Sequence, residues 1–317
     1  MLMNKPTLLL GVLISTLGLS ACQKPDSKES VQNIEQPSAS AAVADTTLTL
    51  QGNTEKLDLN LPECGGQSCP EVSIDRLHTN QFVVDDIIDR AILQQLARIL
   101  AISNPDQPPS VDKQQPTSTS IESNATKTAA QQMAEQVQPY VTEFLALDQE
   151  LRTLGSNSKI NLMVSPKILN ADGPLATVVL NTSSYLGGAH GSASQTYYNF
   201  DLKHQKQVSL DDILLPQQKA NLEKLAYQAF KIWVTDAKLA DNMADYEKVW
   251  KFSLSNNFYL GQNGLILQYA EYEIGPYVAG LPRLEIPYAQ LQSILKKQYL
   301  PATDQVAGAA SEVKAQS

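Results

Sequence analysis

Apolar side chains recur at helical spacing along three long segments of the chain. In residues 84–100, 133–154 and 222–233 they stand three or four positions apart, with polar side chains between them. This period places the apolar side chains on one face of an amphipathic helix. Asp85 and Asp86 lie near the start of the first segment, where the helix dipole favours carboxylates. The pattern predicts three helices, each with one buried face.

Alternation of apolar and polar residues in period two predicts strands elsewhere. Turn residues at 171–174 and 261–264 separate alternating segments into two hairpins, the second through the strong turn pair Asn263-Gly264. Hairpins interspersed with helices predict an α+β fold, an antiparallel sheet with helices packed on one face. The expected strands cover residues 48–50, 57–61, 160–164, 175–185, 193–202, 258–260, 265–269 and 284–286.

Polar, low-complexity segments separate the predicted folded blocks. They contain few large apolar side chains, so they bury too little surface to offset the entropy of ordering and are predicted to be disordered. The predicted organisation is a signal peptide at 1–21, a disordered tether at 22–45, a small β-α domain at 46–103, a disordered insert at 104–126, a C-terminal domain at 127–300 and a disordered tail at 301–317.

The first residues have the layout of a secretory signal. Lys5 is followed by the apolar run Leu8–Ile14 and by small residues before Cys22. The run is too short for a membrane span, which needs about 20 mostly apolar residues. Leu19–Cys22 resembles the lipobox of bacterial lipoproteins, whose cysteine is lipidated and becomes the first residue after cleavage. An ordinary cleaved signal with an incidental cysteine is the alternative.

The resemblance to lipoproteins implies a lipid anchor on Cys22 and a place in the cell envelope. Lipoproteins of Gram-negative cells usually stay in the inner membrane when aspartate follows the lipidated cysteine. Here Gln23 and Lys24 follow it. The outer membrane, facing the periplasm or the cell surface, is therefore favoured over the inner membrane.

The chain is acidic, with a formal net charge of −9. Removal of everything up to Cys22 leaves 23 basic and 33 acidic side chains, a net charge of −10. Phosphate binding needs clustered Lys and Arg, so this balance argues against nucleic acid as a partner. It is compatible with a cationic partner.

Cys64 and Cys69 are predicted to form a disulfide. Gly65 and Gly66 let the short loop between them bend back, and exported proteins fold in oxidising compartments. Closing this loop contributes about 2 kcal/mol in the chain-entropy model. A redox pair would prefer Cys-x-x-Cys spacing, and a zinc site would need further ligands in a chain with three histidines. We expect no metal and no cofactor.

A glycine-rich loop at 185–191 contains Gly188 and His190. Its glycines permit positive φ and a close approach of the backbone to a ligand. One interpretation makes His190 a general base or a ligand contact. The other makes it a hydrogen-bonded residue in a tight strand connection, because nothing in the local sequence supplies the orienting group and oxyanion site of a catalytic pair.

A second candidate loop, residues 269–280, is rich in tyrosine although aromatic residues make up 6% of the chain. Tyr272, Glu273 and Tyr277 are its candidate recognition residues. Tyrosines suit recognition because they offer a large rigid contact area with a polar tip. They serve equally as anchors of a loop. Glu271 and Glu273 form a pair of carboxylates, but such a pair alone is a poor indication of a glycosidase.

Six motifs occur in the order seen in one known family. They resemble the extracellular domain of the anti-sigma factor RsiV, a lysozyme-binding domain that also accompanies some peptidoglycan deacetylases and occurs in many lipoproteins. The resemblance covers residues 158–298 strongly and 46–100 more loosely. The motifs are Gly187–Gly191, Asn199–Leu202, Ser209–Asp212, Asn263–Leu265, Tyr272–Gly280 and Ile286–Tyr288.

The resemblance to the RsiV-like family implies a recognition domain and not an enzyme. A lysozyme-type muramidase is the first partner to expect, and a cell-wall component the second. An anti-sigma role is not expected, because it also needs a sigma-binding segment and a membrane helix. Two alternatives remain open: a peptidoglycan-directed hydrolase that uses His190, and a purely structural envelope protein.

Overall fold

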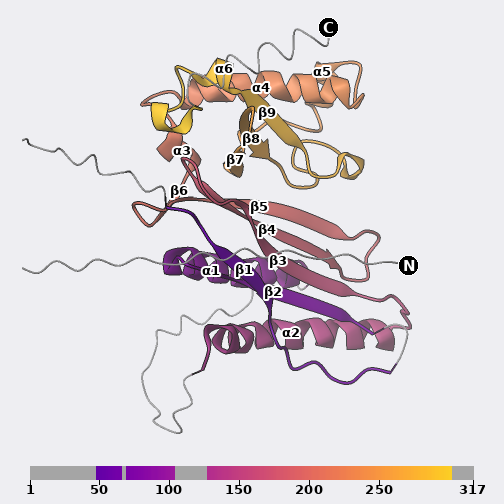
Figure 1. Ribbon diagram of the computed structural model, residues 1–317. Coiled ribbons are helices and arrows are strands. Elements are labelled where there is room, and N and C mark those ends of the chain that lie inside the picture. Colours follow the sequence, from indigo (N-terminus) through magenta and orange to yellow (C-terminus); the bar gives the residue numbers. More distant parts are fainter. Residues whose placement is uncertain (1–47, 66–68, 104–126, 302–317) are drawn as a thin grey trace, which may run out of the picture. The chain divides into compact units, whose positions relative to one another are not determined.

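The computed structural model describes residues 48–65, 69–103 and 127–301. Within these ranges, strands β1 to β6 form one sheet in the order of the sequence, which we call the large sheet (Figure 1). Neighbouring strands are antiparallel except β2 and β3, which are parallel. The strands are β1 (Gly52–Lys56), β2 (Glu71–Thr79), β3 (Asn161–Asn170), β4 (Ala176–Tyr185), β5 (Ser192–Asp201) and β6 (Lys206–Val208).

The parallel pair follows from the long connection between β2 and β3. This connection includes α1 (Phe82–Ser103) and α2 (Ala129–Thr153), and parallel strands need a crossover of a dozen or more residues. Both helices pack on one face of the large sheet and contact each other. The predicted α+β fold, an antiparallel sheet with helices on one face, is therefore confirmed, and the one parallel pair, β2 with β3, is an addition to it.

The first hydrophobic core lies between the large sheet and the two helices. Strand side chains two positions apart and helix side chains three or four positions apart meet there, as the periodic patterns predict. Burial of each such side chain contributes about 1.5 to 3 kcal/mol. Fully buried examples are Ile74, Leu162, Val164, Val178 and Leu180 from the sheet, Ile88, Ile92 and Leu96 from α1, and Val137, Val141 and Phe144 from α2.

The second core belongs to the C-terminal part of the chain. There α4 (Lys219–Asp236) packs on a second sheet, which we call the small sheet, made of β7 (Phe258–Leu260), β8 (Gly264–Gln268) and β9 (Arg283–Pro287). Figure 1 shows α4 lying along this sheet. The shorter elements around it are α3 (Leu210–Ile213), α5 (Met243–Tyr246), η1 (Tyr277–Ala279), α6 (Tyr288–Leu291) and η2 (Lys297–Tyr299).

Amide side chains link the two cores along β5 and β7. Asn199, which is 1% exposed, donates from Nδ2 to the carbonyl oxygen of Phe258 at 2.7 Å. Asn257 donates from Nδ2 to the carbonyl oxygen of Gln195 at 2.7 Å and accepts from the backbone N–H of Tyr197 at 2.8 Å. These amides satisfy backbone groups that would otherwise be buried without partners.

The structure corrects the first part of the strand prediction. Neither 48–50 nor 57–61 is a strand, and β1 lies between them. All five residues of β1 are exposed, so the strand carries no alternation to detect. Leu50 and Leu57, which suggested strands, are instead buried anchors at its two ends, 2% and 3% exposed.

Strand β2 was not predicted. Its buried positions alternate, but one of them holds Arg76, which is 5% exposed. A charged residue at a buried position interrupts the apolar period on which strand prediction depends.

The expected boundary between 46–103 and 127–300 does not separate two cores. Strands β1 and β2 and helix α1 come from the first block, and they share one hydrophobic core with α2 and β3 to β5 from the second. The boundary between the two cores falls later in the chain, after Leu202. Beyond this residue the buried apolar side chains belong to the second core.

Cys64 and Cys69 form the predicted disulfide, with their Cα atoms 5.9 Å apart. The predicted signal peptide, the lipidation site Cys22 and the segments 22–45 and 104–126 lie outside the described residues, as does the tail after Pro301. In the described part of the chain, no helix combines the length and the apolar character that a membrane span requires.

Candidate recognition surface

Four aromatic side chains stack in sequence on the surface of the described part of the chain. The ring centroids of His190 and Tyr277 are 4.7 Å apart, those of Tyr277 and Tyr272 are 5.6 Å apart, and those of Tyr272 and Trp250 are 6.4 Å apart. All three pairs are near parallel, with interplanar angles of 21° to 27°. We call these four residues the aromatic row.

The aromatic row is accessible to a partner. His190 is exposed, Tyr272 is 52% exposed, and Tyr277 and Trp250 are partly buried. Val278, the neighbour of Tyr277 in the sequence, is 86% exposed.

Two loops from different parts of the fold meet at the aromatic row. His190 lies in the connection between β4 and β5 of the large sheet, and Tyr272 and Tyr277 lie in the connection between β8 and β9 of the small sheet. The Tyr277 hydroxyl donates to the carbonyl oxygen of Gly191 at 3.1 Å. Both loops singled out in the sequence therefore contribute to one surface.

Glu271 also joins the two loops. One carboxylate oxygen accepts from the backbone N–H of Ala193 and the other from the Ser192 hydroxyl, each at 3.1 Å. Glu273 has a different role, because its carboxylate accepts from the backbone N–H of Ala270 at 2.8 Å and closes its own turn. Glu271 was not among the residues predicted for the site, although it lies two positions from one that was.

The tyrosine-rich loop contains both recognition candidates and an anchor. Tyr269 is 1% exposed, its hydroxyl donates to the carbonyl oxygen of Ser253 at 2.9 Å, and burial raises its pKa. Tyr272 adopts a left-handed backbone with φ of 62°, which is uncommon for a bulky residue and concentrates at functional sites. Tyr269 is therefore an anchor of the loop, and Tyr272 is a candidate for recognition.

Gly187, and not Gly188, is the glycine that the first loop requires. Gly187 has φ of +84°, and a Cβ there would lie 2.8 Å from a methyl carbon of Leu151. Gly188 is exposed, and a Cβ built on it meets nothing within 4 Å. The structure thus gives no steric reason for a glycine at the predicted position 188.

His190 lacks the surroundings of a general base. Among the described residues it makes neither a hydrogen bond nor an ion pair, and its contact is the stack on Tyr277. A catalytic histidine is normally oriented by a hydrogen bond that its ring N–H donates to a third group. The described ranges also contain no group of three or more His, Cys, Asp or Glu side chains that could hold a metal ion.

The aromatic row lies outside four grooves of the described part of the chain. One groove, of about 980 Å³, lies between the β3–β4 turn and the β7–β8 turn, where Asn170, Tyr259 and Tyr288 line it. No residue of the aromatic row lines this groove or the other three. Small-molecule sites are concave, so the aromatic row suits a macromolecular partner better.

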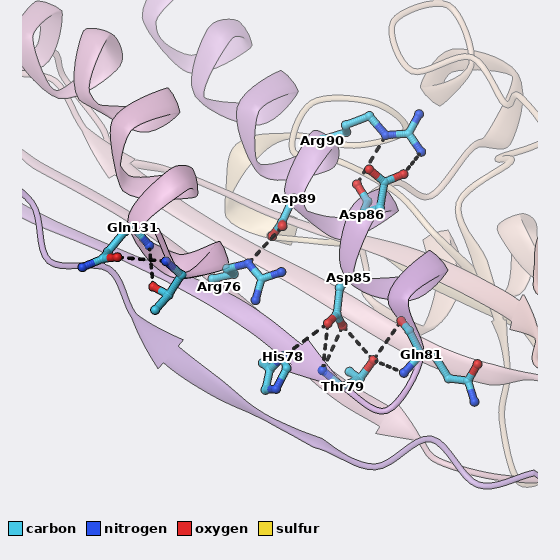
Figure 2. Close-up of polar contacts among 10 residues, drawn as sticks. Arg76, His78, Thr79, Gln81, Asp85, Asp86, Asp89, Arg90 and Gln131 are labelled. Carbon is cyan, nitrogen blue, oxygen red and sulfur yellow. Dashed lines mark hydrogen bonds and ion pairs between the residues drawn. The ribbon is translucent and has the colours of Figure 1, made fainter. Parts of the chain in front are cut away.

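A polar cluster gathers where β2 meets α1 (Figure 2). Asp85, on the first turn of α1, accepts from the backbone N–H of Thr79 at 2.9 Å and from its hydroxyl at 2.7 Å. One turn later, Asp89 accepts from Arg76 Nε at 3.0 Å. These contacts fix the turn between strand and helix, so the cluster has a structural role.

One atom of this polar cluster is left unpaired. Asp89 Oδ1 is buried and has no hydrogen-bond partner within the described part of the chain. Burial raises the pKa of Asp89 to about 6, although the nearby Arg76 acts in the opposite direction. The carboxyl therefore takes up a proton in mildly acidic solution.

Comparison with known proteins relates the C-terminal part to a family. Residues 211–289 match the family described as a protein of unknown function, DUF3298. The chain is 28% identical over 171 residues to the peptidoglycan-N-acetylmuramic acid deacetylase PdaC of Bacillus subtilis (strain 168). This match covers 52% of the chain and 35% of the relative, so the chain spans about a third of that protein.

Two solved structures have a similar fold. A DUF3298 family protein from Pseudomonas aeruginosa PAO1 is 25% identical, with a TM-score of 0.54, over 80% of this chain and 97% of that one. A member from Bacteroides fragilis NCTC 9343 is 19% identical, with a TM-score of 0.53, over 80% of this chain and 96% of that one. The α+β architecture is thus shared with two solved DUF3298 family structures.

Proposed function

We propose that this protein is a non-catalytic recognition module of the bacterial cell envelope and that the aromatic row is its contact surface. One observation carries the proposal: rings from three segments of the chain form an ordered, accessible stack, and His190 within it has no catalytic partner among the described residues. Rigid aromatic side chains supply much of the binding energy in protein interfaces.

The envelope location in this proposal rests on the lipobox-like segment before Cys22. Lipid on Cys22 would hold the protein at a membrane, with the outer membrane favoured. The similarity to a peptidoglycan deacetylase supports an envelope role. Labelling of cells with a palmitate analogue, followed by membrane fractionation, tests it. Label that persists in a Cys22→Ser variant contradicts this anchor.

A lysozyme-type muramidase is the first partner to test. The resemblance to the RsiV-like family supports it, and so does the formal net charge of −9, because such muramidases are cationic. Opposite net charges accelerate association and suppress encounters with acidic proteins.

The experiment measures retention of the fragment that begins at Thr46, which forms one compact unit, on immobilised hen egg-white lysozyme at physiological salt. We expect binding that weakens at least about tenfold, or about 1.4 kcal/mol, in Tyr277→Ala. Phe82→Ala is the matched control, because Phe82 is an aromatic residue, 82% exposed, outside the aromatic row. Absence of retention, or equal loss in both variants, contradicts this partner and this surface.

A cell-wall component is the second candidate, because the curated relative is named for its action on peptidoglycan. Cosedimentation of the same fragment with insoluble peptidoglycan distinguishes it from the first. The hydrolase alternative predicts release of soluble fragments during that incubation and loss of the release in His190→Ala. We expect no release, since His190 has no orienting partner in the described part of the chain.

A further inference from the structure

The aromatic row depends on how two separate loops are held together. His190 belongs to a strand connection of the large sheet and Tyr277 to a strand connection of the small sheet, 87 positions further along the chain. The two residues stack at 4.7 Å. A stack between separate loops persists when other contacts fix the loops relative to each other, because each loop has its own freedom to move.

Glu271 provides a charged contact between the tyrosine-rich loop and the start of β5, where the His190 loop ends. Its two carboxylate oxygens accept from Ala193 N–H and from the Ser192 hydroxyl at the first two positions of β5. Hydrogen bonds to an ionised carboxylate are about twice as strong as those between neutral groups. Glu271 therefore binds the first two residues of β5, where the His190 loop joins the large sheet.

We propose that Glu271 is the positioning residue of the aromatic row: by holding the start of β5, it sets His190 against Tyr277 and completes the recognition surface. This inference rests on the proposed function for its biological meaning. Glu271 acts through the backbone of β5 and not by touching the partner. The hydrogen bond from the Tyr277 hydroxyl to Gly191 assists it at the same junction.

Glu271 and Glu273 make a natural pair for comparison. They have the same side chain two positions apart in one loop, yet Glu273 bonds within its own turn, to Ala270 N–H, and makes no contact with β5. If the net charge of the loop alone held the two loops together, both residues would contribute. The geometry assigns the effect to Glu271.

Proton NMR of the histidine rings tests the positioning without any partner. The chain has three histidines, and stacking on Tyr277 shifts the ring protons of His190 upfield, while His78 and His204 serve as internal references. In Glu271→Ala we expect the His190 signals to move toward random-coil positions. Tyr277→Leu, which removes the stacked ring, defines the full displacement. Glu271→Gln retains an acceptor and is expected to give an intermediate displacement.

Lysozyme binding is measured on the same variants. We expect Glu271→Ala to weaken it about tenfold, Glu271→Gln less, and both to unfold at nearly the wild-type temperature. Glu285→Ala is the matched charge-removal control, since the Glu285 side chain is exposed on β9 and makes no hydrogen bond with any other described residue. It is expected to leave both the His190 signals and the binding unchanged.

The outcomes separate the inference from the proposed function. Unmoved His190 signals in Glu271→Ala, whatever happens to binding, overturn the positioning role. Signals that move as far in Glu273→Ala as in Glu271→Ala also overturn it. Moved signals with unchanged lysozyme binding overturn the proposed function, because the aromatic row would then be dispensable for recognition. Moved signals with weakened binding support both.

Discussion

The polar cluster between β2 and α1 and the aromatic row both concentrate chemically versatile side chains, yet their surroundings differ. In the polar cluster, Thr79 and Asp85 bind each other and Arg76 binds Asp89. In the aromatic row, His190 and Tyr272 are exposed and make no hydrogen bond within the described part of the chain. Charged groups that satisfy one another build the fold, whereas exposed rings in a fixed arrangement remain available to a partner.

The strongest test of this contrast is Arg76→Ala. It leaves the partly buried Asp89 carboxylate without its counter-ion, and we expect the free energy of unfolding to fall by about 3 kcal/mol. Denaturant unfolding measures the loss. Lysozyme binding of the folded variant should be unchanged, because the polar cluster is not part of the recognition surface.

Arg90→Ala is the control for that variant, since Arg90 pairs with Asp86 on the exposed side of α1, with Nη2 and Oδ2 2.7 Å apart. Removal of an exposed pair of this kind costs under about 1 kcal/mol. Equal losses of unfolding free energy in the two variants would show that burial does not strengthen the ion pair of Arg76 with Asp89.

A smaller effect is expected from pH. The pKa of Asp89 is about 6 in the folded protein, above its ordinary value of 3.8, so the folded state holds the proton more tightly than the unfolded chain. The resulting stability is fully present below pH 3.8 and is lost as the pH rises through 6. Between pH 4 and pH 7 we expect a loss of about 1 to 3 kcal/mol from this group.

Other carboxyls contribute with the opposite sign, chiefly at the acidic end of that range and below it. Hydrogen bonds from Ser209 lower the pKa of Asp212, so its contribution is lost as the pH falls. The pH dependence of Asp89 is therefore taken as the difference between wild type and Asp89→Asn, measured by denaturant unfolding from pH 4 to pH 7. A constant difference would contradict the raised pKa.

The smallest stability effect, with the clearest loss of binding, is expected from Tyr272→Gly. Glycine adopts the positive φ of 62° without the strain that a side chain meets there. This gain offsets the lost contacts of a half-exposed ring, so we expect thermal stability within about 0.5 kcal/mol of wild type. Lysozyme binding, measured in parallel, should fall clearly. A large loss of stability would make Tyr272 a structural residue.

Much of the fold could be predicted from period alone. The three helices and both hairpins are confirmed because their buried faces consist of apolar residues at regular spacing. Periodicity did not predict strands β1 and β2. Strand β1 has no buried face, and β2 has the charged residue Arg76 at a buried position. The position of β2 in the sheet also depends on its pairing with β3, which is distant in the sequence.

The candidate site could be predicted as two loops but not as one surface. The composition of the two loops indicated His190 and Tyr277 as candidate site residues. The contact between these loops, however, depends on how the two hydrophobic cores are joined. Trp250 was missed, although it is one of two tryptophans in the chain, and a partly exposed tryptophan is a usable indicator of an interface. Glu271 could not have been distinguished from Glu273 without the backbone of β5.

The parallel pairing of β2 and β3 also imposes an order on folding. Ser165 on β3 donates to Asp75 on β2 at 2.8 Å across 90 positions of sequence. Residues 48–103 contain β1, β2 and α1 but not the strand and helix that complete their core. Pairing over such a separation is slow. The elements β1, β2 and α1 therefore gain their stability when β3 and α2, which lie later in the chain, pack against them.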